Sequence, residues 1–190
     1  MNDTNKSKWF VLRTTYGREQ KASEYLRLQH ITVFCPTVSV TKLVDGKRHT
    51  SNVSRLPNLF FAYGTEEEIK HYVYDNVNLP YLRFYYRNSH IGQQRAKEPL
   101  TVPRAQMDSF RIICQAEAND TYLSSLAVQK FTTGELVRIT QGKFSGVVGR
   151  VSRFMGQQRV GIVIDGLLTI ATAYVPSAFL ERIDADSKPY

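Results

Sequence analysis

Residues 134–183 form a succession of short β-branched segments separated by glycine-containing turns, and this pattern restricts the fold more than any other part of the sequence. Short, turn-punctuated segments of this kind are typical of small β-barrels. Turns are expected at Met155-Gly156 and at Asp165-Gly166, because Asp-Gly favours the positive φ angles of a two-residue hairpin turn. We therefore predict a small SH3-like β-barrel domain over residues 133–185.

The stretch GELVRITQGKFSGVVGRV, residues 134–151, contains a Gly-Lys pair that invites comparison with phosphate-binding loops. A P-loop needs the pattern GxxxxGK[ST] followed by a helix, because backbone N–H groups and the helix dipole hold the phosphates. Here Val137 occupies the place of the first glycine, Phe144 occupies the place of the hydroxyl residue, and a β-rich segment follows. A nucleotide cradle is therefore excluded. The glycines are expected instead to form a tight turn or to let strands approach closely: Gly142, Gly146 and Gly149.

The first part of the chain alternates strand-like and helix-like segments, which indicates an α+β domain with helices on one face of a mixed or antiparallel sheet. An Asp45-Gly46 hairpin turn joins two extended segments, and Thr65 with Glu68 forms a capping box at the start of a helix. Strands are expected at 8–14, 32–44, 47–53, 56–64 and 82–87, and helices at 17–30, 65–76 and 102–115. We predict a first domain at residues 1–118 and a linker at 119–132, where the sequence becomes small and polar.

The chain has 25 Lys and Arg against 17 Asp and Glu, a net charge of +8 that favours contact with polyanions such as nucleic acid. The excess is unevenly distributed. Residues 1–118 hold 17 basic and 11 acidic residues, a net of +6, whereas residues 119–190 hold 8 and 6, a net of +2. A nucleic-acid surface is therefore expected mainly on the first domain.

Several other classes of function are disfavoured by what the sequence lacks. No apolar run approaches the ~18 residues of a membrane span, and the N-terminus has no apolar signal stretch, so a cytoplasmic protein is expected. The two cysteines and four histidines have no metal-ligand spacing, and no metal or other cofactor is expected. Two reduced, buried thiols are the expected state of the cysteines. No carboxylate pair or triad appears at usable spacing, so an enzyme is not expected.

The glycine-rich stretch resembles the KOW motif of transcription factors and ribosomal proteins. It matches in the leading Gly134-Glu135 and in the turn residues Gly142, Lys143, Phe144, Gly146 and Gly149. WFVLRTTYGREQKASEYL is similar to the opening of the NusG N-terminal domain. The Pro36 position, the Gly-Lys-Arg hairpin tip, LPNLFF and the late VPRAQMDSF are closer to NusG paralogues of the RfaH and UpxY type. The resemblance spans about residues 8–183.

This resemblance implies a non-enzymatic transcription elongation or antitermination factor. Relatives bind the clamp helices of bacterial RNA polymerase through an apolar patch, bridge the cleft towards the gate loop, and suppress pausing or termination. UpxY-type members are associated with capsular polysaccharide operons. Carried over by position, the polymerase-binding residues are expected to be Leu56, Leu59, Phe61, Phe84, Met107 and Phe110. An ordinary core role is the alternative for each, because alternation along PNLFFAYG puts Leu59 and Phe61 on one face and Phe60 and Ala62 on the other.

The expected nucleic-acid surface lies at the start of the first helix and at the hairpin tip. Its residues are Arg13, Thr15, Tyr16, Arg18, Lys21, Lys47 and Arg48. Basic groups would hold phosphates of the single-stranded non-template DNA while Tyr16 would stack on a base. Solvated surface charge is the alternative.

Further expectations concern partners. The resemblance of the barrel to KOW domains implies a ribosomal protein as a partner, and a monomer is expected. A fold switch of the barrel is not expected, because ELVRIT and RVGIVI strongly favour strands. His71 falls near the segment that faces the gate loop in relatives, with a plain exposed histidine as the alternative. The alternative function is a ribosome-associated or general RNA-binding KOW protein, which would place basic charge on the barrel.

Overall fold

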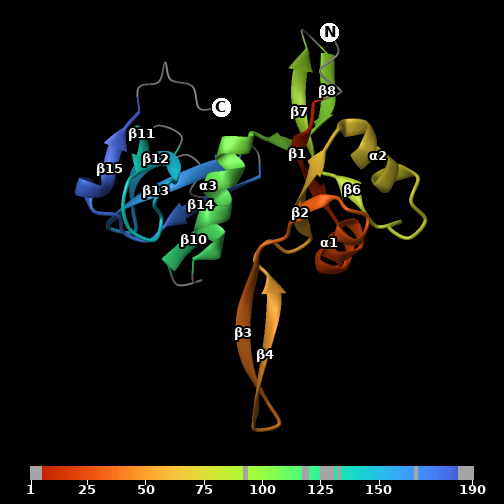
Figure 1. Ribbon diagram of the computed structural model, residues 1–190, viewed down its shortest axis with the longest axis horizontal. Coiled ribbons are helices and arrows are strands. Elements are labelled where there is room, and N and C mark those ends of the chain that lie inside the picture. Colours follow the sequence, from red (N-terminus) through yellow and green to blue (C-terminus); the bar gives the residue numbers. More distant parts are fainter. Residues whose placement is uncertain are drawn as a thin grey trace. The chain divides into compact units, whose positions relative to one another are not determined.

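The structure is a computed structural model that describes residues 6–91, 94–116, 120–124, 131, 134–164 and 167–183. The chain divides into two compact units, Met1–Val102 and Pro103–Tyr190. Both units combine helical segments with antiparallel strands, so the predicted α+β class is confirmed (Figure 1). This division lies before the third helix, and the domain boundary expected at 118 stays a prediction.

The first unit begins with a strand and a helix, as predicted, and continues mainly with strands. Its elements are β1 (Lys8–Arg13), α1 (Glu19–Leu28), β2 (Thr32–Phe34), β3 (Thr37–Val44), β4 (Lys47–Ser54), β5 (Leu59–Gly64), α2 (Glu66–Tyr74), β6 (Arg83–Phe84), β7 (Tyr86–Ile91), β8 (Gln94–Pro99) and β9 (Thr101–Val102). The capping box of α2 is confirmed: Thr65 Oγ1 accepts a hydrogen bond from the Glu68 N–H at 3.3 Å, and Glu68 Oε2 accepts one from the Thr65 N–H at 3.4 Å.

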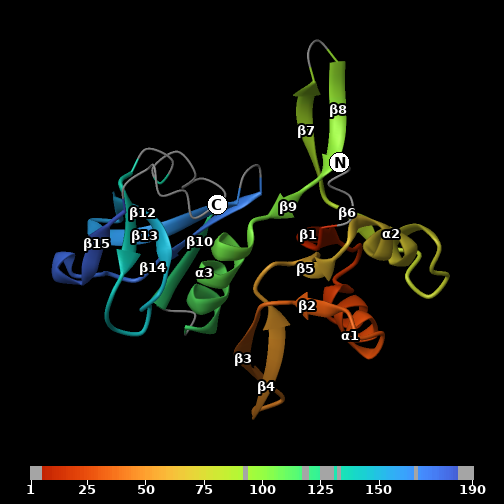
Figure 2. The same cartoon turned by 45° about the horizontal axis from the view of Figure 1, so that its top comes forward.

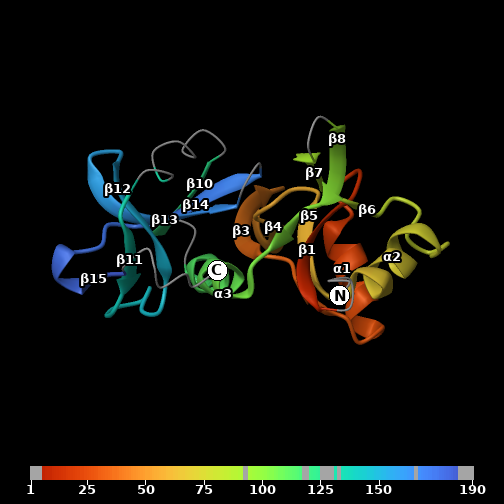
Figure 3. The ribbon, with the colours of Figure 1, turned by 90° about the horizontal axis from the view of Figure 1, so that it is seen from above.

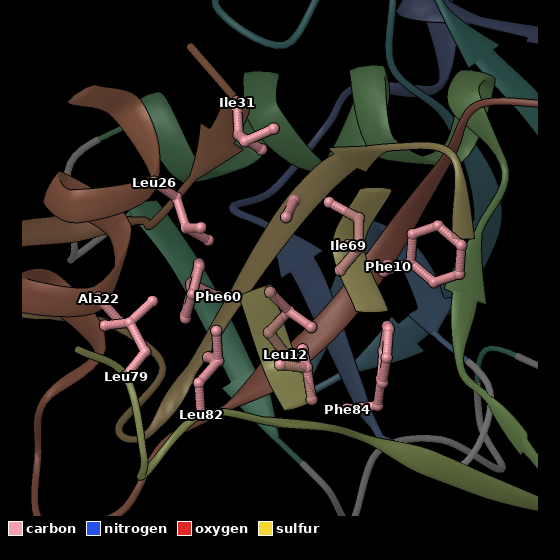
Figure 4. Packing of buried hydrophobic residues seen from close by; sticks show 12 residues of the cluster. Phe10, Leu12, Ala22, Leu26, Ile31, Phe60, Ile69, Leu79, Leu82 and Phe84 are labelled. Atoms are coloured by element: carbon pink, nitrogen blue, oxygen red, sulfur yellow. The ribbon is translucent and has the colours of Figure 1, made fainter. Parts of the chain in front are cut away.

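The central sheet of this unit has the strand order β2-β5-β1-β6, with β9 also paired to β1, and all of these pairs are antiparallel. Helices α1 and α2 cover one of its faces. Figure 4 shows the resulting core, in which Leu26 of α1 and Ile69 of α2 pack with Phe10, Leu12 and Phe60 of the sheet. Apolar side chains at alternate strand positions therefore define this face as the core face.

Strands β3 and β4 form a separate two-stranded ribbon. The predicted turn is confirmed, since Asp45 and Gly46 have φ angles of 50° and 74°, both in the left-handed region that such a turn requires. Most side chains of the ribbon are exposed, and Thr41 and Thr50 are hydrogen-bonded to each other across it at 3.0 Å. The ribbon therefore presents its tip to solvent instead of contributing to the core.

Strands β7 and β8 form a second ribbon that the sequence did not predict. The ribbon is inserted between β6 and β9, which pair with successive parts of β1: β6 with Leu12 and Arg13, and β9 with Trp9 and Phe10. Strands β6 and β9 therefore form one edge of the sheet, and the ribbon interrupts it. Val11, between these two positions, bonds to both ends of the interruption. Its N–H donates to Leu100 O, and its carbonyl accepts from the Tyr85 N–H, both at 2.9 Å. Figures 1 and 2 show this ribbon leaving the sheet on the side opposite to the β3–β4 ribbon.

The second unit contains a helix followed by strands. Its elements are α3 (Arg104–Gln115), β10 (Thr121–Ser124), β11 (Leu136–Ile139), β12 (Val148–Phe154), β13 (Gln157–Ile164), β14 (Leu168–Thr172), the 3-10 helix η3 (Ser177–Phe179) and β15 (Leu180–Arg182). The strands form one antiparallel sheet in the order β10-β14-β13-β12-β11-β15. Strand β10 lies in the segment expected to be the linker. The expected turn at Met155-Gly156 is present, with φ angles of 52° and 74°, and Asp165-Gly166 lies outside the described residues.

Helix α3 packs against this six-stranded sheet (Figure 3). Gln106 Nε2 donates to Val163 O at 2.6 Å, and Ser109 Oγ accepts from the Val148 N–H at 3.0 Å. A Cβ atom built at Gly146 would lie 3.6 Å from Ile112 Cδ1. These three helix residues are spaced by three positions and so share one face of the helix. That face attaches α3 to the second unit.

Candidate nucleic-acid interface and apolar surface

The loop between β1 and α1 has an unusual backbone that is fixed by Asn58. Tyr16 and Gly17 have φ angles of 60° and 64°, a region that a bulky residue such as tyrosine rarely occupies. Asn58, with φ of 64°, binds the loop twice: its Oδ1 accepts from the Gly17 N–H and its carbonyl from the Thr14 N–H, both at 2.8 Å. The chain therefore holds Tyr16 in a strained conformation with its side chain 88% exposed.

Arg18 directly follows this loop, and aromatic rings flank its guanidinium group. The Arg18 Cζ atom lies 5.9 Å from the centre of the Tyr16 ring and 4.8 Å from that of Tyr81, within the range of cation–π interactions. Helix α1 is tied to the base of the β3–β4 ribbon, because Gln20 Nε2 donates to Asn52 O at 3.1 Å. The contacts with the Tyr16 and Tyr81 rings therefore define where the Arg18 guanidinium group lies relative to Tyr16. The hydrogen bond between Gln20 and Asn52 links helix α1 to the ribbon.

The structure exposes every residue expected to bind nucleic acid. These residues are Arg13, Thr15, Tyr16, Arg18 and Lys21 around the loop, and Lys47 and Arg48 at the ribbon tip. An exposed aromatic ring beside guanidinium and ammonium groups can stack on a base while the cations contact phosphates. Asn58 and Tyr81 were missed by the sequence-based assignment, although an asparagine before a strand is a known signal for a left-handed turn.

The expected apolar surface is arranged differently from the prediction. Of its six residues only Leu59 is half-buried, whereas the others are at most 3% exposed: Leu56, Phe61, Phe84, Met107 and Phe110. The strand register explains why Phe84 does not join Phe61. Phe84 pairs with Leu12, on the helix-covered face, and its ring lies 5.6 Å from that of Phe10, whereas Phe61 pairs with Val11 on the opposite face. Including Phe84 in one patch with Phe61 was therefore incorrect.

The face that carries Phe61 is rich in aromatic residues that the sequence-based assignment omitted. Phe34 pairs with Phe61, with ring centres 6.3 Å apart, and Trp9 pairs with Tyr63, with ring centres 5.3 Å apart. Phe34 and Tyr63 are half-buried, like Leu59. The accessible apolar residues on this side of the sheet are therefore Phe34, Leu59 and Tyr63.

Met107 and Phe110 lie on α3, in the second unit, and are fully buried. The alternative weighed for both residues was an ordinary core role, and their burial agrees with it. A surface shared by these two residues and Leu59 stays a prediction.

The glycine-rich turn has the expected geometry. Gly142 and Gly146 have φ angles of 81° and 88°, and the Gly146 N–H donates to Ile139 O at 2.8 Å, which closes the turn. A Cβ atom built at Gly149 would lie 2.6 Å from Gly161 O, so this glycine allows β12 and β13 to approach. Phe144 is buried, which leaves it no role as a phosphate contact.

Several basic side chains of the second unit are already engaged. Lys143 Nζ lies 2.5 Å from Asp120 Oδ2, and Arg182 Nε lies 3.2 Å from Glu135 Oε2. Arg159 is 3% exposed, donates to Thr172 O at 2.9 Å and stacks 4.0 Å from the Tyr122 ring centre. These contacts reduce the cationic surface that this unit can offer to a polyanion.

Titratable groups outside the loop serve structural contacts. Burial raises the pKa of the Cys35 thiol, and Cys35 and Cys114 are not joined in a disulfide bond. Burial, and then a hydrogen bond with Tyr74, raises the pKa of Tyr86 to about 12. His71 is exposed, and its Nδ1 atom lies 3.8 Å from Asp75 Oδ2.

Within the described ranges no group of three or more His, Cys, Asp or Glu side chains could hold a metal ion. None of the described helices is long and apolar enough to cross a membrane.

The first unit is thus an α+β domain with helices on one face of an antiparallel sheet and a basic, aromatic loop at one sheet end. Residues 7–111 match the NusG family, described as transcription termination factor nusG. Because this match covers more than half of the sequence, the chain belongs to the NusG family. The family consists of non-enzymatic transcription elongation and termination factors that interact with RNA polymerase. No match to the chain was found among curated proteins.

Proposed function

We propose that this protein is an antitermination factor of the RfaH and UpxY type, which binds the clamp helices of RNA polymerase and the non-template DNA strand to suppress pausing or termination. The proposal includes action at specific operons such as capsular polysaccharide loci. Family membership supports the elongation-factor role. The observation that carries the proposal is the strained loop that exposes Tyr16 beside Arg18.

The loop favours a single strand over a duplex as its ligand. In a duplex the faces of the bases are stacked, whereas an unpaired base can offer its face to an aromatic ring. Tyr16 is 88% exposed, and its left-handed backbone is held by the hydrogen bonds of the loop to Asn58. Strain of this kind is typical of functional positions, where surrounding contacts maintain it. Arg13 and Lys21 would contact phosphates on either side of the stacked base.

For the polymerase contact we propose the half-buried residues Phe34, Leu59 and Tyr63, on the sheet face opposite α1 and α2. Aromatic and leucine side chains give the large apolar area that a helical partner needs. Phe61, which pairs with Phe34, would position these residues from a buried site. A contact of His71 with the gate loop is part of the same proposal.

For the second unit we propose a KOW-type SH3-like barrel that contacts a ribosomal protein. The six-stranded antiparallel sheet and the glycine turn at 142–146 support this assignment. The engagement of Lys143 and Arg182 in ion pairs disfavours the alternative, a general RNA-binding protein that acts through this unit. The basic surface of the first unit is the better support for nucleic-acid contact.

A competition experiment tests the proposal. Purified protein would be bound to RNA polymerase, and an isolated clamp-helix fragment would be added as competitor. We expect the fragment to displace the wild-type protein, and we expect Leu59→Ala to weaken binding without loss of thermal stability. Leu123→Ala, at an exposed site of the second unit, is the matched control. Protein that ignores the fragment but binds RNA tightly would contradict the proposal.

A further inference from the structure

The Tyr16 loop depends on a residue outside it for its conformation. Residues 15–17 are all exposed, so packing contributes little to the order of the loop. A tyrosine with a left-handed backbone is disfavoured by a free energy similar in size to the gain from one or two hydrogen bonds. The bonds from the Thr14 and Gly17 N–H groups to Asn58, both at 2.8 Å, therefore control the fraction of molecules in which the loop has this conformation.

We propose that Asn58 and Tyr81 are positioning residues for nucleic-acid binding. Asn58 holds the Tyr16 ring where an unpaired base can stack on it, and Tyr81 holds the Arg18 guanidinium group beside that ring. This role rests on the binding of single-stranded DNA by the Tyr16 loop that is proposed above. It adds that the affinity depends on two half-buried residues, which act through Tyr16 and Arg18 and not through contacts of their own with DNA.

Asn58 has the properties that a positioning residue requires. It is half-buried, and asparagine adopts a left-handed φ, here 64°, more readily than most residues that have a Cβ atom. The next residue, Leu59, pairs with Arg13 in the register of β5 with β1, so Asn58 is fixed at the end of the central sheet. Both of its oxygen atoms accept hydrogen bonds from loop N–H groups, one before and one after Tyr16. A fixed residue therefore holds the loop on both sides of the exposed ring.

Tyr81 restrains the basic group next to this loop. Its ring is half-buried and packs against the hydrophobic core of the first unit. The Arg18 Cζ atom lies 4.8 Å from the centre of this ring, closer than the 5.9 Å to the ring of the exposed Tyr16. The buried Tyr81 hydroxyl has no hydrogen-bond partner within the described part of the chain, so the ring alone makes the contact with Arg18. Tyr81 is thus a fixed aromatic surface against which the guanidinium group lies.

The test measures the Kd of the full chain for a labelled single-stranded oligonucleotide in a double-mutant cycle. Asn58→Gly keeps the left-handed backbone and removes the Oδ1 acceptor. We expect it to raise the Kd by about 2- to 13-fold, the change in population that corresponds to one hydrogen bond. In the Tyr16→Ala background the same substitution should change the Kd by less than about twofold, because Asn58 acts through the Tyr16 ring.

A second cycle pairs Tyr81 with Arg18. Tyr81→Leu removes the aromatic ring and should raise the Kd by about 2- to 5-fold, as expected for loss of a cation–π interaction near the surface. The conservative variant Tyr81→Phe removes only the hydroxyl without a partner and should restore the wild-type Kd. The effect of Tyr81→Leu should disappear in the Arg18→Ala background. Thermal unfolding checks that each variant is folded, and if Tyr81→Leu is not, the cycle of Asn58 with Tyr16 decides the outcome.

Two results would overturn the positioning role. One is a wild-type Kd for both Asn58→Gly and Tyr81→Leu, and the other is an equal fold-change with and without the contacting residue. The variants Tyr16→Ala and Arg18→Ala test the proposed function separately. If they lose affinity while the positioning variants do not, the DNA contact stands and the role of Asn58 and Tyr81 is wrong. If they also bind like the wild type, the DNA contact itself is wrong.

Discussion

Tyr16→Ala separates a role in nucleic-acid binding from a role in folding. The Tyr16 side chain is 88% exposed, so its removal uncovers little buried apolar surface. Alanine would adopt the same backbone conformation, with φ of 60°, at a similar steric cost, because both residues have a Cβ atom. We therefore expect the free energy of unfolding to change by less than about 0.5 kcal/mol, as at other exposed positions.

The expected loss of binding is much larger. Stacking of a base on an aromatic side chain contributes about 1–3 kcal/mol by alanine substitution. Since about 1.4 kcal/mol corresponds to a tenfold change in affinity, the Kd for single-stranded DNA should rise between about 5-fold and about 140-fold. The ring of Tyr16 also lies 5.9 Å from the Arg18 Cζ atom, but the closer Tyr81 ring, at 4.8 Å, still holds that guanidinium group in the variant.

Fluorescence anisotropy with a labelled single-stranded oligonucleotide measures this change. Tyr174→Ala is the matched control, because Tyr174 is also exposed, at 55%, and lies in the second unit. We expect the control to bind within twofold of the wild type. Equal Kd values for Tyr16→Ala and the control, with both proteins folded, would refute the stacking argument.

Three predictions concern the chemistry of the fold. Burial raises the pKa of the Cys35 thiol, so less of it is thiolate at pH 7. In a Cys114→Ser protein, Cys35 should therefore react with a thiol-specific reagent much more slowly when the protein is folded than when it is unfolded in urea. Equal rates in the two states would contradict this. The pKa of Tyr86 is raised to about 12 against about 10 in the unfolded chain, so its contribution to stability is fully present below pH 10 and is lost as the pH rises through 12. In urea unfolding, the free energy of unfolding should fall less between pH 10 and pH 12 for Tyr86→Phe than for the wild type. Identical pH profiles of the two proteins would count against this. Arg159→Met removes the guanidinium group that donates to the buried carbonyl of Thr172 and should lower the free energy of unfolding by about 1–3 kcal/mol. Arg182→Met, at an exposed ion pair, should change it by less than about 1 kcal/mol. Similar values for the two variants would show that Arg159 is not the buried donor described above.

Local signals in the sequence predicted local structure well. Asp45-Gly46 specified a hairpin turn, and Thr65 with Glu68 specified a helix start, because each depends on residues that are neighbours in the chain. The exposed residues of the candidate loop were also found, since their basic and aromatic character does not depend on distant contacts. The left-handed backbone that holds Tyr16 could not be found, because it depends on hydrogen bonds to Asn58, 41 residues away from Gly17.

The errors concern pairing between distant segments. Alternation along β5 divides its residues between two faces, but only the register with β1 shows that Phe84 shares the face of Leu12 and not that of Phe61. The β7–β8 ribbon was missed because RNSHIGQQRAK has few β-branched residues and no apolar alternation. The ends of the insertion are marked by their hydrogen bonds to Val11, a contact between segments that are distant in the chain.

The burial of Phe61 also changes how the central claim should be tested. Truncation of a fully buried phenylalanine typically costs about 3–5 kcal/mol, so Phe61→Ala would confound unfolding with loss of polymerase contact. Leu59 and Arg18 are accessible enough to be replaced without this cost.

The most direct measurement is therefore pause-resolved in-vitro transcription with purified RNA polymerase on a candidate leader sequence. We expect the wild-type protein to shorten pauses or to increase read-through of a terminator, Arg18→Ala and Leu59→Ala to lose most of this effect, and Tyr174→Ala to retain it. Pause lifetimes and read-through that are unchanged by saturating wild-type protein on every template tested would contradict the proposed antitermination function.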